Sequence, residues 1–403
     1  MPPSPPQHLA DLPPAERDQW VVAGGWPRMR GRQLARHYFD HLTCDPAAMS
    51  DLPATHRAQL VSQYLPTLLS EVKRQSCDAG ATVKILYGLF DQAAVETVVM
   101  AYPERVTACI STQVGCAMGC PFCATGRQGL TRSLSAAEMV DQVRLAAALV
   151  RQSVLPASGH QRLSNVVLMG QGEPMAAYSA TVQALRVISQ DTPNGLGISA
   201  RKLTVSTCGL IPGIERLSTE GLPVRLAISL HAPDDEARDQ LVPINAKYPV
   251  AKVLEAAHGY FLATGRRVSI EYALIRGIND QQWRARLLAE RLRHHGTKWV
   301  HVNPIPLNPV DQSPRREPDG PLHRPRTVRT GRVHAGSRPA AAGKDSKQPA
   351  QQALWQASGS AAVARFVATL EAAGLAVTLR DTRGREIDGA CGQLAASEVG
   401  GDR

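Results

Sequence analysis

Short runs of β-branched and other apolar residues recur through the middle of the chain, and amphipathic stretches separate most of them. Each run has the length of one strand, and the helix-like stretches between them are long enough for crossover connections. The runs are VTACIST at 106–112, NVVLMG at 165–170, KLTVST at 202–207, VRLAISLH at 224–231, VSIEYALI at 268–275 and WVHVNPIPL at 299–307. This alternation predicts a parallel sheet, either as an open doubly wound sheet or as a partial barrel.

Amphipathic periodicity predicts three helices between these strands, over 133–152, 250–265 and 280–296. In the first, Ser135 and Glu138 have the spacing of a capping box, which fixes where the helix starts. The other two end at glycine, the residue that most readily takes the left-handed conformation of a helix C-terminus. These signals support an α/β architecture.

The first 105 residues lack this alternation of strands and helices. Residues 1–70 are expected to form a small helical accessory domain, in which Leu34, Tyr38 and Leu42 share one apolar face. Arginines on the other face suit either simple solvation or contact with RNA; they are Arg30, Arg32 and Arg36. Residues 71–105 are expected to be a short β linker region, with two strands in 81–101 and a turn near Asp91.

The alternation of strands and helices predicts a core domain over 106–310, and it ends there. Residues 311–354 are rich in Pro, Gly, Arg and Lys and almost free of apolar residues, so a disordered basic insertion is expected. Residues 355–403 resume with a helix that ends at Gly374, a last strand LAVTLRDT and a tail that contains RGREIDGACGQL.

Composition narrows the class of protein. Hydrophobic residues make up 43% and charged residues 20% of the 403 residues, which suits a globular protein. The first residues lack the basic and apolar regions of a signal peptide and no run has transmembrane length, so a cytoplasmic protein without membrane contact is expected. A formal charge of +10 favours a polyanionic partner such as nucleic acid.

Three cysteines in GCAMGCPFCATG form a C-x3-C-x2-C pattern; they are Cys116, Cys120 and Cys123. Structural zinc sites and common iron–sulfur clusters take four ligands, so one ligand is missing. A [4Fe-4S] cluster held by three thiolates leaves one iron open, which the amine and carboxylate of S-adenosylmethionine (SAM) could chelate. Zinc with a distant fourth ligand is the alternative interpretation.

Polar residues follow several of the predicted strands. Glu173 in GQGEP follows the second strand, Ser206 ends the third, Ser229 and His231 end the fourth, and Asn308 follows the sixth. Ligands of parallel α/β proteins bind at the carboxyl ends of the strands, the same edge that carries the cysteine loop. We therefore expect a binding site at this edge.

Five motifs together resemble the radical SAM superfamily and, within it, the RlmN/Cfr family. They are CISTQVGCAMGCPFCATGRQG, VVLMGQGEP, VSTCG, AISLHAPDDEARDQLVPIN and RGREIDGACGQL, and the resemblance covers roughly residues 20–310 and 355–395. It implies a partial (β/α)6 barrel with a small helical N-terminal accessory domain. The long segment after Asn308 departs from the family and touches none of these motifs.

The resemblance implies a methyltransferase that acts on C2 of an adenosine in the peptidyl-transferase region of 23S rRNA, and on the adenosine beside the anticodon of some tRNAs. Methylation of adenine C8, as in Cfr, is an alternative within the family. A non-catalytic, zinc-containing RNA-binding protein is the alternative outside it. The expected cofactors are a [4Fe-4S] cluster and two SAM molecules per turnover, with an external electron donor such as flavodoxin and a monomeric enzyme.

The resemblance also implies roles for single residues. Cys116, Cys120 and Cys123 would hold the cluster, and Cys391 would carry the methyl group as S-methylcysteine. Cys109 would resolve the covalent intermediate through a transient disulfide, and Glu96 would accept a proton. The SAM site would be lined by Gly172, Glu173, Ser206, Ser229, Leu230, His231 and Asn308. The other cysteines, Cys44, Cys77 and Cys208, are expected to be ordinary buried residues.

Overall fold

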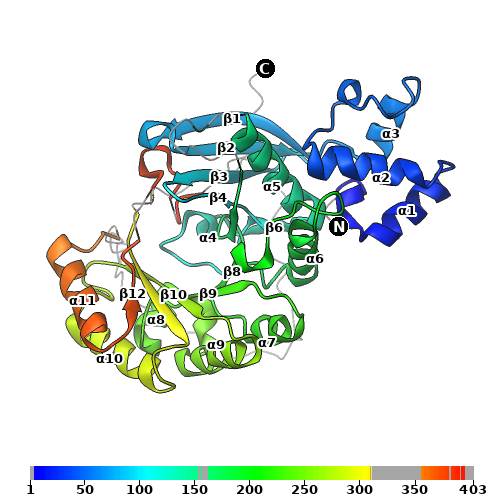
Figure 1. The fold of residues 1–403 in the computed structure, drawn as a ribbon. Helices are drawn as coiled ribbons and strands as arrows, with labels where there is room; N and C mark the ends of the chain where they lie inside the picture. Colours follow the sequence, from blue (N-terminus) through cyan, green and yellow to red (C-terminus); the bar gives the residue numbers. More distant parts are fainter. Residues whose placement is uncertain are drawn as a thin grey trace, which may run out of the picture.

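One ten-stranded sheet organises the part of the chain that the computed structural model describes, namely residues 4–152, 155, 162–308, 310, 355–380, 383–390 and 392–394. The strands lie side by side in the order β1-β2-β3-β4-β7-β8-β9-β10-β11-β12 (Figure 1). The expected insertion over 311–354 lies outside the described residues.

The parallel half of the sheet forms the barrel. Its strands are β4 (Arg105–Cys109), β7 (Asn165–Leu168), β8 (Leu203–Thr207), β9 (Arg225–Ser229), β10 (Val268–Leu274), β11 (Val300–Pro306) and the short β12 (Ala376–Val377). All neighbouring pairs from β4 to β12 are parallel. The six predicted strands and the partial barrel are therefore confirmed.

Helices cover the outer face of this half of the sheet (Figure 1). They include α5 (Ala136–Arg151), α6 (Tyr178–Ser189), α7 (Ile211–Thr219), α9 (Val250–Thr264), α10 (Gln282–Arg293) and α11 (Ser360–Ala372). Two short helices, α4 (Ala124–Gln128) and α8 (Asp235–Leu241), follow the cysteine loop and the end of β9. The predicted capping box is present, because Ser135 and Glu138 each accept a hydrogen bond from the backbone of the other. Gly265 ends α9 in the left-handed conformation, as predicted.

Three antiparallel strands extend the sheet on the N-terminal side of β4. They are β1 (Leu69–Cys77), β2 (Thr82–Leu89) and β3 (Ala94–Tyr102), so the two strands expected within 81–101 are present. Sequence analysis missed β1. Its side chains are exposed from Ser70 to Arg74, because it is an edge strand with no buried face to impose alternation. Residues 71–105 thus belong to the main sheet.

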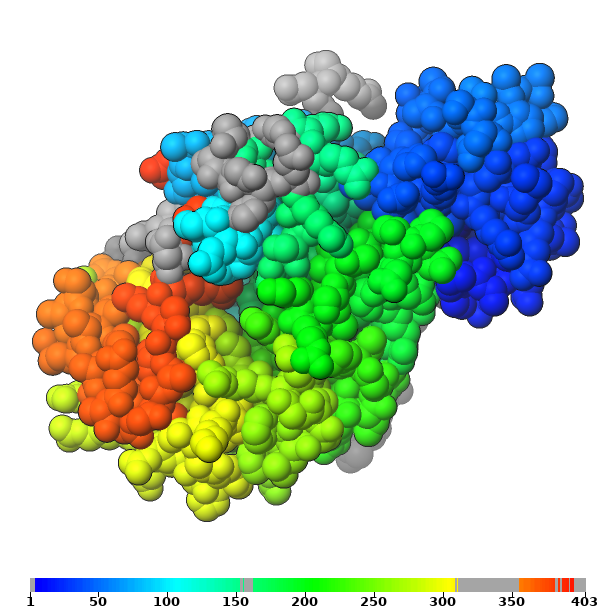
Figure 2. All heavy atoms as spheres, in the orientation of Figure 1, coloured from blue at the N-terminus to red at the C-terminus, as the bar shows by residue number. Residues whose placement is uncertain are grey.

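The N-terminal helices form a lobe at one end of the molecule (Figure 2). They are α1 (Pro14–Ala23), α2 (Met29–Ala35), a π-helix (Arg36–Asp40) and α3 (Arg57–Tyr64). The predicted apolar face is buried, and the hydroxyl of Tyr38 donates a 2.9 Å hydrogen bond to Asp141 on α5. This contact helps to fasten the lobe to the barrel.

Short elements complete the fold. A hairpin of β5 (Gln113–Gly115) and β6 (Leu130–Ser133) stands apart from the main sheet. Single turns of 3-10 helix occupy Leu9–Asp11, Pro46–Ala48, Asp78–Gly80, Ala200–Lys202, Pro243–Ala246 and Arg385–Ile387. No helix in the described ranges is both long and apolar enough to cross a bilayer.

The C-terminal segment runs from the parallel half of the sheet to its antiparallel half. After β12, the N–H groups of Thr378 and Arg380 donate to the carbonyl groups of β11. The chain then reaches the antiparallel half, where the Gly384 N–H donates to the carboxylate of Asp78 at 3.2 Å. Arg383 donates to the carbonyl of Ala101 on β3. The segment therefore lies across the opening of the partial barrel.

Candidate active site at the carboxyl ends of the parallel strands

The cysteine loop is closed at its base by the β5–β6 hairpin. The N–H of Cys116 donates a 2.8 Å hydrogen bond to the carbonyl of Gly129. Gly115 has a φ of +74°, and a Cβ there would lie only 1.9 Å from that carbonyl oxygen, so the approach requires glycine. The loop then turns into α4 at Cys123, the N-cap of that helix.

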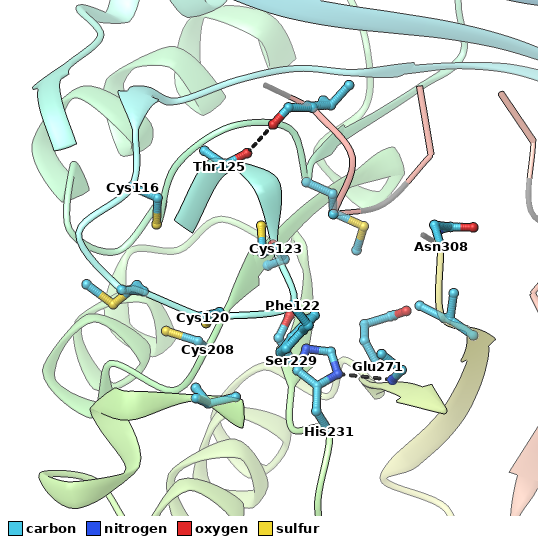
Figure 3. Close-up of a pocket in the computed structure, with 18 of the residues that line it drawn as sticks. Cys116, Cys120, Phe122, Cys123, Thr125, Cys208, Ser229, His231, Glu271 and Asn308 are labelled. Atoms are coloured by element: carbon cyan, nitrogen blue, oxygen red, sulfur yellow. Dashed lines mark hydrogen bonds between the residues drawn. The ribbon is translucent and has the colours of Figure 1, made fainter. Parts of the chain in front are cut away.

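All three cysteines of the loop line one pocket, which Figure 3 shows with Cys208 beside Cys120 and with Glu271 and Asn308 on the far side. Burial raises the pKa of Cys116 to about 11 and that of Cys120 further. These thiols are thus protonated unless a metal displaces the protons, as metal binding to cysteine does. Three thiols on one wall of a pocket fit a cluster that is held at three corners.

Residues from five strand ends line the same pocket. Six of the seven residues expected to contact SAM are among them: Gly172, Glu173, Ser206, Ser229, His231 and Asn308. The seventh, Leu230, is not among the lining residues; its side chain is fully buried and its N–H donates to the carbonyl of Glu271. The structure therefore brings the polar strand ends together at the edge that carries the cysteines.

Glu173 is held in a fixed orientation by the backbone around it. Its two carboxylate oxygens accept hydrogen bonds, each 2.9 Å long, from the N–H groups of Met175 and Cys208. Burial raises the pKa of Glu173, while these hydrogen bonds act against that rise. The side chains of Cys208 and Thr207 also hydrogen-bond to this carboxylate, so Glu173 is held rigidly at the wall of the pocket.

His231 is a neutral imidazole with a defined tautomer. Burial, with a further contribution from Arg238, lowers its pKa to about 3. Its Nδ1 lies 3.0 Å from the N–H of Ala273 and accepts that hydrogen bond, so the proton resides on Nε2. The ring meets Phe122 edge to face, with centroids 5.0 Å apart. His231 can therefore present an N–H donor but no charge.

Sequence analysis missed an ion pair at this site. Arg380 lines the pocket, and its guanidinium lies 3.2 Å from the carboxylate of Glu271 on β10. Asn303 also donates to Glu271, at 2.8 Å. An acidic residue inside a buried parallel strand was the available signal, because such strands are normally apolar throughout. Cys208, expected to be an ordinary buried cysteine, also lines the pocket.

A second pocket adjoins the first. Cys109, at the end of β4, lines it together with Met100 and Tyr102. Five of its residues also line the first pocket: Met169, Ile305, Asn308, Arg380 and Leu394. The site therefore has two connected compartments, one at the cysteine loop and one at Cys109.

Cys391 lies outside the described residues, but its neighbours in sequence are described. Ala390 lines the pocket at Cys109, and Gly392 lines the pocket at the cysteine loop. The carbonyl of Gly392 accepts a 2.8 Å hydrogen bond from the N–H of Ala124, at the start of α4. The tail is thereby attached to the element that follows the cysteine loop.

Glu96 lines neither pocket. It is buried on β3 and forms a 2.9 Å ion pair with Lys84 on β2. Side chains alternate between the two faces of a strand, so Glu96 lies on the same face of β3 as Val98 and Met100. Val98 packs with Cys109 and Leu394, so Glu96 faces the same side of the sheet as the tail.

The comparisons with known proteins agree with this arrangement. Residues 110–289 match the model of the Radical SAM superfamily. The probable dual-specificity RNA methyltransferase RlmN of Bifidobacterium longum is 49% identical over 98% of this chain and 91% of its own length. The protein with the same description from Thermobifida fusca is 51% identical, over 98% of this chain and 96% of its own.

A solved structure is also similar. The radical SAM methyltransferase from Sphaerobacter thermophilus superimposes with a TM-score of 0.82 at 40% identity, over 97% of this chain and all of that one. Full-length identity near one half, together with the shared barrel, confirms the predicted membership. The chain belongs to the RlmN family of methyltransferases, within the radical SAM superfamily.

Proposed function

We propose that this enzyme methylates C2 of an adenosine in 23S rRNA, and of the adenosine beside the anticodon in some tRNAs. The names of its full-length relatives support RNA as the substrate. The observation that carries the proposal is the pair of adjoining pockets, with the three thiols of the cysteine loop in one and Cys109 in the other. Such a site suits a reaction in which a group is activated in one compartment and delivered in the next.

The first pocket fits a [4Fe-4S] cluster with SAM. Cys116, Cys120 and Cys123 would hold three irons, and the polar strand ends would hold SAM, with Glu173 accepting from its ammonium group. When bound, the two groups supply a methyl group and a 5′-deoxyadenosyl radical, which is needed because adenine C2 is not nucleophilic. The protein's own share is to place the reactants and to exclude water.

In this proposal the target adenine would approach the second pocket, where Cys109 and the neighbours of Cys391 lie. Cys391 would receive the methyl group on its sulfur, lose one hydrogen atom of that group to the 5′-deoxyadenosyl radical and bond through the same carbon to C2. Glu96 would take the proton from C2 as one electron leaves the adduct for the cluster. Cys109 would then attack the sulfur of Cys391; the bond between sulfur and the transferred carbon would break, that carbon would take up a proton and become the methyl group, and a Cys109–Cys391 disulfide would remain. The lining of this pocket by both Cys109 and Ala390 supports the pairing.

The remaining features of the proposal concern partners. One SAM would supply the methyl group and a second the radical, so two are used per turnover. An external donor such as flavodoxin would supply the electron. The protein would act as a monomer in the cytoplasm, where rRNA and tRNA are found.

Nucleoside mass spectrometry tests the position of the methyl group. We expect a strain that lacks the gene to lose 2-methyladenosine from its 23S rRNA, and the anaerobically purified protein to restore it. Appearance of 8-methyladenosine instead would place the enzyme with Cfr and overturn the C2 assignment. Zinc in place of about four iron and four sulfide per chain would overturn the cluster.

A further inference from the structure

Lys84 is a buried cation that the proposed reaction leaves without a role. It lies on β2, directly opposite Val98 of β3, and only 9% of its side chain is exposed. Residues directly opposite in an antiparallel pair share one face of the sheet, so Lys84 lies on the face of Glu96 and of the tail. Burial of an ammonium group is costly, which demands partners for it.

The first partner of Lys84 is the carboxylate of Glu96. Lys84 Nζ lies 2.9 Å from Glu96 Oε1, and the exposed fraction of the Glu96 side chain is 7%. The ammonium group thus lies against the carboxylate that is proposed to accept the proton, and it holds that side chain in one orientation.

The second partner is the backbone of the C-terminal tail. Lys84 Nζ donates to the carbonyl oxygen of Asp388 over 3.4 Å. The next residue is Gly389, where an added Cβ would lie 3.7 Å from Lys84 Cδ. Gly389 and Ala390 both line the pocket at Cys109. One ammonium group therefore contacts Glu96 and the segment that leads to Cys391.

We propose that Lys84 is a positioning residue for methyl transfer to RNA: it orients Glu96 and fixes the tail three residues before Cys391. The inference rests on the proposed function, because it assumes the roles of Glu96 and Cys391. An ammonium group has three donors, so it can serve both acceptors at once. The tail keeps separate anchors at Ala124 and Thr125, so methylation of Cys391 itself depends less on Lys84.

Four variants of the full-length, cluster-loaded enzyme test this role: Lys84→Met, Lys84→Arg, Glu96→Gln and the double variant Lys84→Met/Glu96→Gln. Lys73→Met is the matched control, since Lys73 is an exposed lysine on the neighbouring strand. Two quantities are measured for each: methylation of Cys391 by intact-protein mass spectrometry, and single-turnover methylation of RNA. Iron content and melting temperature report on folding.

We expect Lys84→Met to slow RNA methylation at least tenfold while Cys391 methylation changes by less than about threefold. Lys84→Arg should restore most of the rate, because the guanidinium keeps the charge. Lys84 and Glu96 act through each other, so the double variant should be no slower than the slower single variant. The double variant should also melt above Lys84→Met, because it buries no unpaired carboxylate.

Three outcomes would overturn the role of Lys84. They are wild-type RNA methylation by Lys84→Met, rate losses that multiply in the double variant, and a parallel fall of both methylation steps with no rescue by arginine. Each presupposes an active wild-type enzyme. A wild type that never methylates Cys391 would instead refute the proposed function, so the two failures are distinguishable.

Discussion

The hydroxyl of Thr125 donates a 2.6 Å hydrogen bond to the backbone carbonyl of Leu394, and both groups are buried. Thr125 lies two residues after the last cysteine of the loop, and Leu394 three residues after Cys391. The bond therefore links the proposed cluster-binding element to the proposed methyl carrier. Leu394 also packs against Val98 and Cys109, which adds an apolar contact at the same point.

Thr125→Val removes this bond with little change in shape. A buried hydrogen bond contributes about 0.5–1.5 kcal/mol net, so the docked state of the tail should become roughly two- to tenfold less favoured. We expect the rate of Cys391 methylation to fall by about that factor at saturating SAM, with unchanged iron content. Thr125→Ser keeps the donor and should stay near the wild-type rate; equal losses in both variants would contradict the assignment.

Cys391→Ala should separate cluster assembly from methyl transfer. The three cysteines of the loop line their pocket without it, so we expect about four iron and four sulfide per chain, as in the wild type. No methyl group should reach RNA, because the proposed carrier is gone. Methylation of RNA by this variant would show that the methyl group does not pass through Cys391.

Cys109→Ala should trap the enzyme on its RNA. Without the thiol that resolves the intermediate, a protein–RNA adduct should accumulate and be visible on a denaturing gel. The adduct should require both SAM and Cys391, so the double variant Cys109→Ala/Cys391→Ala provides the control. Loss of activity with no adduct would make Cys109 a packing residue beside Val98.

Glu173→Gln should weaken SAM binding and lower stability less than Glu173→Ala does. A charge-assisted hydrogen bond is worth about 1.5–3 kcal/mol, which corresponds to a roughly ten- to hundredfold higher Kd. Glutamine keeps one acceptor for the N–H groups of Met175 and Cys208, whereas Glu173→Ala leaves both unsatisfied and should also lower stability. Calorimetric titration checks the affinity, and an unchanged Kd in Glu173→Gln would remove this carboxylate from the SAM site.

His8 should make the protein less stable in mild acid. Burial lowers its pKa to about 4 from an ordinary value of 6.5, so the unfolded chain binds this proton at a higher pH than the folded one. Stability is therefore lost as the pH falls from 6.5 towards 4, by about 2 kcal/mol at pH 5. The Nδ1 of His8 caps the first turn by accepting from the N–H of Ala10, a role that asparagine can take over.

Urea denaturation of the wild type and of His8→Asn, at pH 7 and pH 5, checks this. Other acid-sensitive groups act in both proteins, so they cancel in the comparison. The wild type should lose about 2 kcal/mol more than the variant between the two pH values. Equal losses would mean that His8 is protonated in the folded state at pH 5.

Local patterns predicted the barrel because its strands contain short runs of buried apolar residues, such as Leu226, Ala227 and Ile228 in β9. Polar residues at or just after the ends of such runs, Glu173 and Ser229 among them, indicated the strand ends, although Glu271 and Asn303 lie inside their strands. β1 carried no such signal, because an edge strand exposed to solvent resembles a loop in composition. Its pairing with β2 depends on backbone hydrogen bonds that any side chain permits.

The sequence position of Glu271 was a local signal, but its pairing with Arg380 was not predictable, because the two residues lie more than a hundred positions apart. No local pattern encodes such a contact. The contact of Lys84 with Asp388 spans 304 positions, so it could not be predicted from local sequence either. Sequence patterns thus located the strands and their ends, while the partners across the opening of the barrel required the folded chain.

The path of the tail across the sheet has a consequence for biosynthesis. Its anchors on Asp78, Lys84 and Thr125 all bind residues from 384 to 394, which leave the ribosome after these anchors. Parts of a chain that are made first can fold first, so the strands from β1 to β10 and the cysteine loop can pair before the tail is available. A nascent chain at that stage would carry the proposed cluster-binding loop without the proposed methyl carrier, and emergence of the tail would complete the site.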